Sequence, residues 1–91
     1  MIDFKTMFER EKIREIVLFL VGRNENGISH PQLDGICTTY GGNHISNIEL
    51  IHLVKDMQYK TEIQSNGKGG YKKSRYWQEP KFVTEKKYGI K

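Results

Sequence analysis

Basic side chains gather around one glycine-rich segment. Residues 65–70 read SNGKGG, and Lys72, Lys73 and Arg75 follow at once. Lysine and arginine bind phosphate oxygens, and glycine lets a backbone approach a polyanion closely because it has no Cβ. With four phosphate contacts, the logarithm of the binding constant would fall with the logarithm of the salt concentration with a slope of roughly −3 to −4. The spacing therefore predicts a phosphate-binding surface of Lys68, Lys72, Lys73 and Arg75; the alternative is a merely solvated basic loop.

A second polar group precedes an apolar helical pattern and consists of Asn43, His44, Ser46 and Asn47. Asparagine can donate to and accept from adenine at once, and serine and histidine can bond base edges or phosphates. The N-terminal end of a helix also favours phosphate. These residues are candidate contacts to nucleic acid. The alternative is that Asn and Ser only cap the helix.

Other chemistries find little support in the spacing. His30, His44 and His52 are far apart, one cysteine is present, and no carboxylate pair completes a ligand set, so no metal site is predicted. Residues 67–74 lack the Gly-Lys-Ser/Thr ending of a nucleotide-binding loop and precede a strand pattern rather than a helix. A domain this small has little room for a deep catalytic cleft. We therefore expect a binding protein without a cofactor rather than an enzyme.

Three polar pairs mark the starts of the elements that must position these side chains. In each, a hydroxyl residue is followed three positions later by Glu or Gln, the spacing of a capping box. The pairs are Thr6 with Glu9, Ser29 with Gln32, and Ser46 with Glu49. Apolar residues at helical spacing follow each pair, which predicts helices over about residues 6–22, 30–40 and 47–58. Two glycines, Gly41 and Gly42, end the second helix.

The apolar residues of these helices form the predicted core. They are Ile13, Ile16, Val17, Leu20 and Val21 in the first helix, Leu33, Ile36 and Cys37 in the second, and Leu50, Ile51, Val54 and Met57 in the third. Ile45 and Ile48 fall on the other side of a continuous third helix. Either the chain bends at Ser46 or this side touches a partner.

The single cysteine, Cys37, excludes an internal disulfide and fits a reducing compartment. Its place in an apolar pattern favours a small core residue over a reactive or intermolecular thiol. We expect a cytoplasmic protein, associated with the nucleoid if its source is bacterial or viral.

The pattern changes to the period of a strand after Met57. Residues 59–64 and 71–78 lie on either side of the glycine-rich turn, and their side chains follow the two-residue period of a strand. This pattern predicts a β-hairpin. Trp77 shares a strand face with Tyr71, which favours an apolar anchor over a base-stacking role. Residues 79–91 form a basic extension in which Phe82, Val83 and Tyr88 are candidates for packing back on the domain.

The order helix, turn, helix, glycine turn, helix and basic hairpin resembles the winged helix-turn-helix family over residues 6–78. The resemblance rests on residues 27–33 (GISHPQL) at the second helix and on residues 50–59 leading into the hairpin. Gln58 stands where the family usually has a glycine. The resemblance implies an α+β, mainly α fold, with residues 1–78 as a three-helix domain that ends in a hairpin wing. It also implies that Ile28 is a short strand beside the wing, with the third helix in the major groove and the wing on the backbone or minor groove.

The charge distribution agrees with a polyanionic partner. The net charge is +4, but residues 60–91 carry nine Lys/Arg and three Asp/Glu, whereas residues 1–59 carry six and eight. The strongest apolar run, residues 16–21, is too short to span a bilayer, so no membrane partner is expected.

We therefore expect a protein that binds double-stranded DNA, most simply a transcriptional regulator. A homodimer would extend the short site that one domain covers. Two alternatives remain. One is a winged-helix protein-interaction module, an adaptor or inhibitor of another protein. The other is a binder of RNA or single strands that stacks bases on Tyr71, Tyr76 and Trp77.

Overall fold

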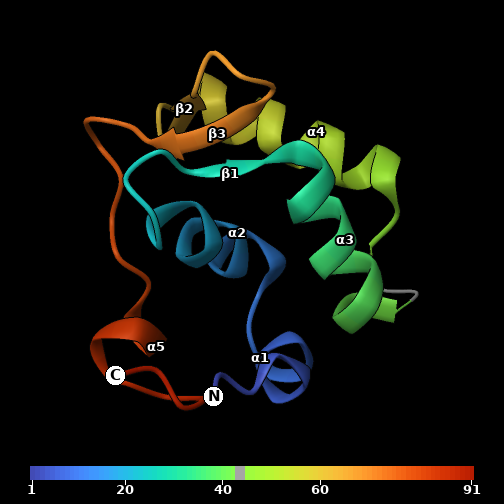
Figure 1. The fold of residues 1–91 in the computed structure, drawn as a ribbon, viewed down its shortest axis with the longest axis vertical. Helices are drawn as coiled ribbons and strands as arrows, with labels where there is room; N and C mark the ends of the chain where they lie inside the picture. The colour runs from blue at the N-terminus through green and yellow to red at the C-terminus, as the bar shows by residue number, and fades with distance from the viewer. Residues whose placement is uncertain (43–44) are drawn as a thin grey trace.

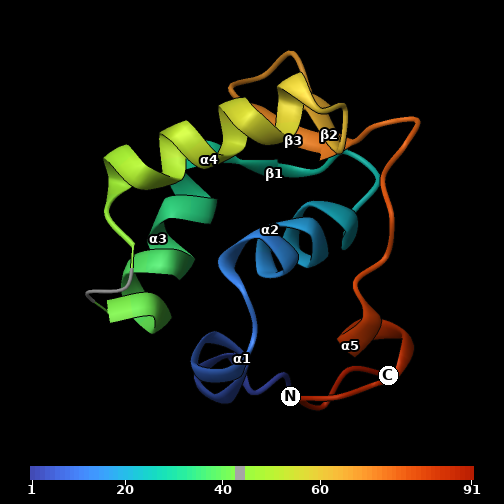
Figure 2. The same ribbon diagram turned by 180° about the vertical axis from the view of Figure 1, so that it is seen from behind.

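One apolar helix runs through the middle of the molecule. The computed structural model describes residues 1–42 and 45–91. The elements in chain order are α1 (Phe4–Arg10), α2 (Ile13–Gly22), β1 (Ile28–Ser29), α3 (His30–Gly41), α4 (Asn47–Tyr59), β2 (Ile63–Ser65), β3 (Gly70–Lys73) and α5 (Lys81–Thr84). Figures 1 and 2 show α4 and the β2–β3 hairpin on one side of α2, with α1, α5 and both chain ends on the opposite side. Residues 16–21 of α2 are all buried, so this helix has no solvent face over that stretch.

The first predicted helix is two helices in the structure, and the capping box predicted at Thr6 is wrong. Asp3 caps α1 instead, because its side chain accepts a hydrogen bond from the Thr6 amide. The chain is extended at Glu11, where φ is −101° and ψ is 155°. A continuous helix turns by roughly 100° per residue, so Met7 and Ile16 would lie on opposite faces. The break lets both become fully buried.

The second and third predicted helices are confirmed, with their capping boxes. The hydroxyls of Ser29 and Ser46 accept from the third backbone amide of α3 and α4, and Gln32 and Glu49 bond back to the cap amides. Gly42 ends α3 with φ of 56°. The chain therefore starts a new helix after Ser46 rather than continuing through it.

A three-stranded antiparallel sheet with the order β1-β3-β2 covers one side of α2. Ile28 of β1 pairs with Tyr71 of β3, as the resemblance implies, and Ser65 of β2 pairs with the other side of Tyr71. Gly27 makes this approach feasible: its φ is 81°, and a Cβ there would lie 1.7 Å from the Tyr71 carbonyl oxygen. Only glycine combines that conformation with that contact.

The hairpin strands are shorter than the alternation predicts. Tyr59 belongs to the last turn of α4, and Thr61 has φ of 59°, which ends the helix and delays β2 until Ile63. β3 stops at Lys73, and the chain then turns so that the Trp77 amide donates to the Ser74 carbonyl. Trp77 is therefore outside the strand that was predicted to contain it.

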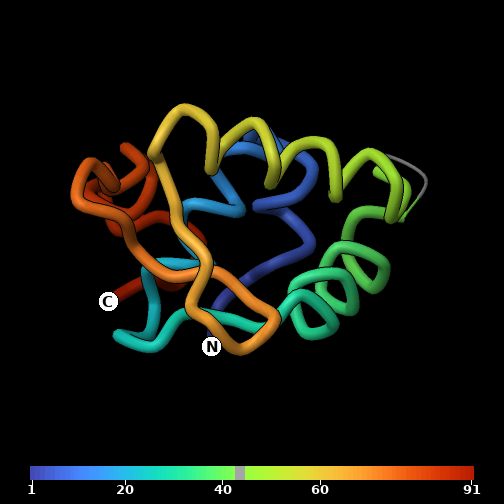
Figure 3. The backbone as a smooth tube through the Cα atoms, turned by 90° about the horizontal axis from the view of Figure 1, so that it is seen from above, coloured from blue at the N-terminus to red at the C-terminus, as the bar shows by residue number. Residues whose placement is uncertain are grey.

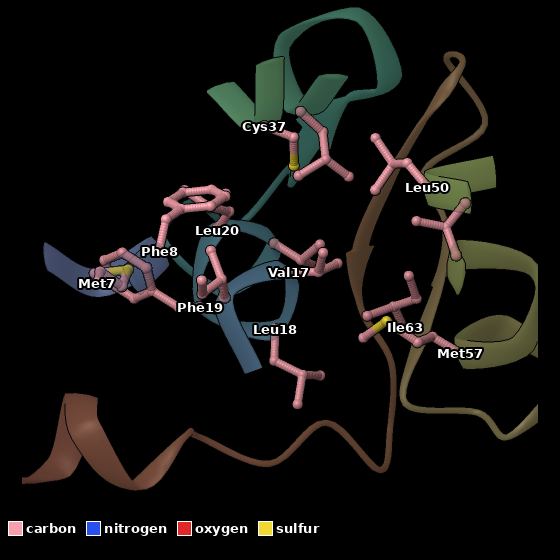
Figure 4. Close-up of a cluster of buried hydrophobic side chains, with 14 of the residues drawn as sticks. Met7, Phe8, Val17, Leu18, Phe19, Leu20, Cys37, Leu50, Met57 and Ile63 are labelled. Carbon is pink, nitrogen blue, oxygen red and sulfur yellow. The ribbon is translucent and has the colours of Figure 1, made fainter. Parts of the chain in front are cut away.

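The core lies between α2 and its neighbours. Figure 4 shows side chains of α2 with Met7 and Phe8 on one side and Leu50, Met57 and Ile63 on the other. Cys37 is buried in the same cluster, as predicted for a core residue.

The C-terminal extension packs back on this core. Phe82 in α5 is buried and makes edge contacts with Phe19 and Tyr88, at centroid distances of 5.7 and 5.6 Å. The Asp3 amide donates to the Tyr88 carbonyl at 2.8 Å, which joins the two ends of the described chain. The fold is thus α+β. Among residues 1–42 and 45–91, no helix has both the length and the apolarity needed to cross a bilayer.

Candidate nucleic-acid interface

The outer face of α4 carries a stripe of which the sequence pattern identified only Ile48. Its members, at helical spacing, are Ile48, His52, Lys55 and Tyr59. Ile48 and Tyr59 are 66% and 79% exposed, whereas Leu50, Val54 and Met57 on the opposite face are buried. The stripe contains one lysine, no acid and a large exposed aliphatic side chain. The signal was in the sequence: Ile48 does not fit the buried face of its own helix.

The hairpin separates its two adjacent lysines. Cross-strand partners share a sheet face, so Lys73 lies on the face of Ile63, which is buried, and Lys72 lies on the opposite face with Gln64. The Lys73 ammonium is 5.0 Å from the centroid of the Trp77 ring. Lys72 therefore lies half-buried on the outer face of the sheet, while Lys73 is exposed, with its ammonium near the Trp77 ring.

The tip of the hairpin is held by one asparagine. The Asn66 side-chain oxygen accepts from the amides of Lys68 and Gly70 at 2.8 and 3.0 Å, and its amide nitrogen donates to the Asn26 carbonyl. Gly67 and Gly69 both have φ of 76° and no atom near where a Cβ would stand. The tip thus presents the exposed Lys68 from an ordered loop with an open backbone.

His30 joins the hairpin to the start of α4. Burial raises the pKa of Tyr71, and its hydroxyl lies 2.8 Å from His30 Nδ1. His30 Nε2 lies 3.2 Å from Asn47 Oδ1, which can only accept, so the ring donates this hydrogen bond. Figure 3 shows the hairpin running from the end of α4 toward the start of α3, where the His30 amide donates to the Gly69 carbonyl. The contact leaves the Asn47 amide nitrogen as its outward hydrogen-bonding group.

A groove separates the C-terminal end of α4 from the hairpin. It has a volume of about 270 Å³, and its lining includes Gln58, Gln64 and Arg75. The Arg75 guanidinium also lies 5.9 Å from the ring centroid of the exposed Tyr76. Amide and guanidinium groups along a shallow groove can donate to phosphate oxygens.

Two of the acids beside this surface, Asp56 and Glu62, are paired with basic side chains within the protein, whereas the exposed Glu49 bonds only Ser46 among the described residues. Arg14 bonds both Asp56, at 3.1 Å, and Glu62, and Lys60 bonds Asp56 at 3.2 Å. Hydrogen bonds from Arg14 and then Lys60 hold the pKa of the Asp56 carboxyl below its ordinary value.

The basic side chains of the same surface are left without internal partners. Within the described ranges, no salt bridge involves Lys55, Lys68, Lys72 or Arg75. The pairing of Asp56 and Glu62 thus reduces the negative charge of this surface, while these basic side chains stay available to a partner.

The remaining predicted site residues have local roles or lie outside the described structure. Ser46 caps α4, and its hydroxyl is 3.2 Å from the Glu49 amide. Asn43 and His44 lie outside the described residues. In the part of the chain that is described, no three His, Cys, Asp or Glu side chains group as metal ligands would.

Trp77 is an anchor, as expected, although it lies beyond the strand. Its indole nitrogen donates to the Leu18 carbonyl at 2.9 Å. Its ring covers Gly22 so closely that a Cβ there would lie 2.3 Å from it.

Comparisons with protein-family models, with curated proteins and with solved structures found no match to this chain.

Proposed function

We propose that this protein binds double-stranded DNA as a winged helix-turn-helix module, with α4 in the major groove and the hairpin on the adjacent backbone or minor groove. The observation that carries the proposal is the acid-free outer stripe of α4 beside a hairpin whose outward lysines have no internal ion pairs. A helix fits the major groove, which is about 12 Å wide. The helix order and the strand order β1-β3-β2 support the winged-helix assignment. The simplest role for such a module is transcriptional regulation.

The test is fluorescence anisotropy of a labelled random duplex at several salt concentrations. We expect binding that weakens steeply with salt. Lys55→Glu in α4 and Lys72→Glu in β3 should each abolish most of the binding. Lys5→Glu in α1, on the opposite side of the molecule, changes the net charge equally and should retain it. A folded wild-type protein that fails to bind at low salt, or equal losses in all three variants, would refute the proposal.

A protein-interaction module is the second candidate, because Ile48 and Tyr59 expose large apolar surface on α4. Exposed apolar surface of this kind is common where proteins dock. Under this alternative, the protein would not bind a duplex. Changing Ile48 to a polar residue would weaken binding to a protein partner and would leave the salt dependence of that binding unchanged.

A further inference from the structure

A second cavity lies on the other side of the molecule, near α5 and the chain ends. It has a volume of about 410 Å³, within the range of about 300–1,000 Å³ that is typical of small-molecule sites. It lies between the C-terminal end of α2, the segment that follows the hairpin, and the two ends of the described chain. The surface of α4 and the hairpin is on the opposite side (Figures 1 and 2).

One part of the cavity wall is apolar, and its aromatic rings are fixed by contacts of their own. This part includes Phe19, Trp77, Val83 and Ile90. Trp77 is held by its hydrogen bond to the Leu18 carbonyl, and Phe19 packs against the buried ring of Phe82. Because these rings are positioned without a ligand, the cavity is preformed and binding would order little of the protein.

The charged side chains of the lining are all basic. They are Arg23 and Lys91, and among the described residues the lining holds no Asp or Glu side chain. The Arg23 guanidinium lies 5.6 Å from the centroid of the Phe19 ring, so a cation stands at the edge of the apolar wall. An apolar body in the cavity would place a negative group beside Arg23.

We propose that this cavity binds a small amphipathic monoanion, a carboxylate or sulfonate with an aromatic or aliphatic body. The apolar walls exclude inorganic anions from the deeper part of the site. The Arg23 guanidinium at the apolar wall favours an anionic ligand over a cationic ligand of the same shape. The site is independent of DNA binding, since it uses none of the residues of α4 or the hairpin strands.

The sole tryptophan gives a direct readout, because Trp77 lines the cavity. The first probe is 8-anilinonaphthalene-1-sulfonate, which accepts excitation energy from tryptophan. We expect energy transfer from Trp77 that saturates with the probe and is reversed by octanoate. Octylamine, which has the same chain and the opposite charge, should not displace the probe. Equal displacement by octanoate, octanol and octylamine would overturn the proposal, as would the absence of energy transfer.

Matched variants locate the site. Arg23→Gln should weaken octanoate binding by about tenfold or more, because a hydrogen bond to a charged group is lost. Lys86→Gln removes the same charge from an exposed side chain outside the lining and should change nothing. Val83→Phe, which fills the cavity, should abolish binding while circular dichroism shows a folded protein. Loss in Lys86→Gln, or displacement of the probe by excess duplex, would place the anion on a basic surface instead and overturn the proposal.

Discussion

Exchanging Lys72 and Lys73 separately for alanine tests the orientation of the hairpin against DNA. The two residues are adjacent and equally charged, so each change lowers the net charge by the same amount. Lys72 lies on the outer face with Gln64, whereas Lys73 lies over the Trp77 ring. We expect only Lys72→Ala to remove a phosphate contact, and we expect Lys73→Ala to lower stability through the loss of its contact with Trp77.

The magnitudes follow from one contact in each case. Each phosphate contact contributes about 0.9 to the log–log salt slope. If Lys55, Lys68, Lys72 and Arg75 each contact a phosphate, raising the salt from about 50 to 200 mM weakens wild-type binding about 150-fold and Lys72→Ala binding about 40-fold. Lys73→Ala should keep the wild-type slope. It should lose about 0.5–1 kcal/mol of stability with its cation–π contact, or about 2–8 °C in Tm.

The assay pairs salt-dependent anisotropy on a labelled duplex with thermal unfolding followed by circular dichroism. Both variants are measured in both experiments, so each serves as the control for the other. Equal flattening of the slope by the two variants would refute the assignment of Lys73 to the inner face. An unchanged slope for Lys72→Ala would remove the outer face of the hairpin from the interface.

Three further outcomes are expected. Replacing thymine by deoxyuridine in a preferred duplex should weaken wild-type binding about fourfold, since one buried methyl group is worth about 0.8 kcal/mol. The same replacement should not change the affinity of the Ile48→Ala variant. An equal loss of affinity in both proteins would exclude a contact between the Ile48 side chain and the thymine methyl group. Gly27→Ala should lower the free energy of unfolding in urea by about 2–4 kcal/mol, because the new Cβ would strike the Tyr71 carbonyl in a strained backbone conformation. Gly35→Ala, in open space on α3, should raise the free energy of unfolding by about 0.5–1 kcal/mol. Similar effects of the two changes would contradict the close approach of β1 and β3. Burial raises the pKa of Cys37 from 9.0 to about 11, so a thiol reagent at pH 8 should react about 100-fold more slowly with the native than with the unfolded protein. Because the folded pKa is the higher one, stability should fall between about pH 9 and 11; fast native labelling would contradict the burial.

Local rules were sufficient where the determining groups are close in sequence. The capping boxes at Ser29 and Ser46 fix the starts of α3 and α4, since each hydroxyl finds its amide three residues away. The hydrophobic period of α4 identified Leu50, Val54 and Met57 as its buried face. Lys68, Lys72 and Arg75 are predicted as phosphate contacts because they cluster in the sequence around the glycine-rich tip, and this assignment stays a prediction.

Long-range packing decided the features that the sequence did not reveal. Nothing between Met7 and Ile16 is a helix breaker, yet burial of both requires the extended residues at Glu11 and Lys12. The positive φ of Thr61 likewise belongs to the junction of α4 with the sheet rather than to a threonine preference. The hydrophobic period placed Ile48 on the outer side of its helix, but Tyr59 was predicted in a strand, because the extra turn of α4 depends on its packing against the sheet.

The central position of α2 makes the chain a single cooperative unit. The other layers pack against different sides of this helix. α1, the sheet and α5 all contact residues 16–21 or their neighbours. A layer that detached would leave part of α2 exposed to water, so its loss would weaken the hold on the remaining layers. Fluctuations that free the hairpin therefore have to be local movements of its tip, and the amides of α2 should exchange their hydrogens with solvent only when the whole domain unfolds.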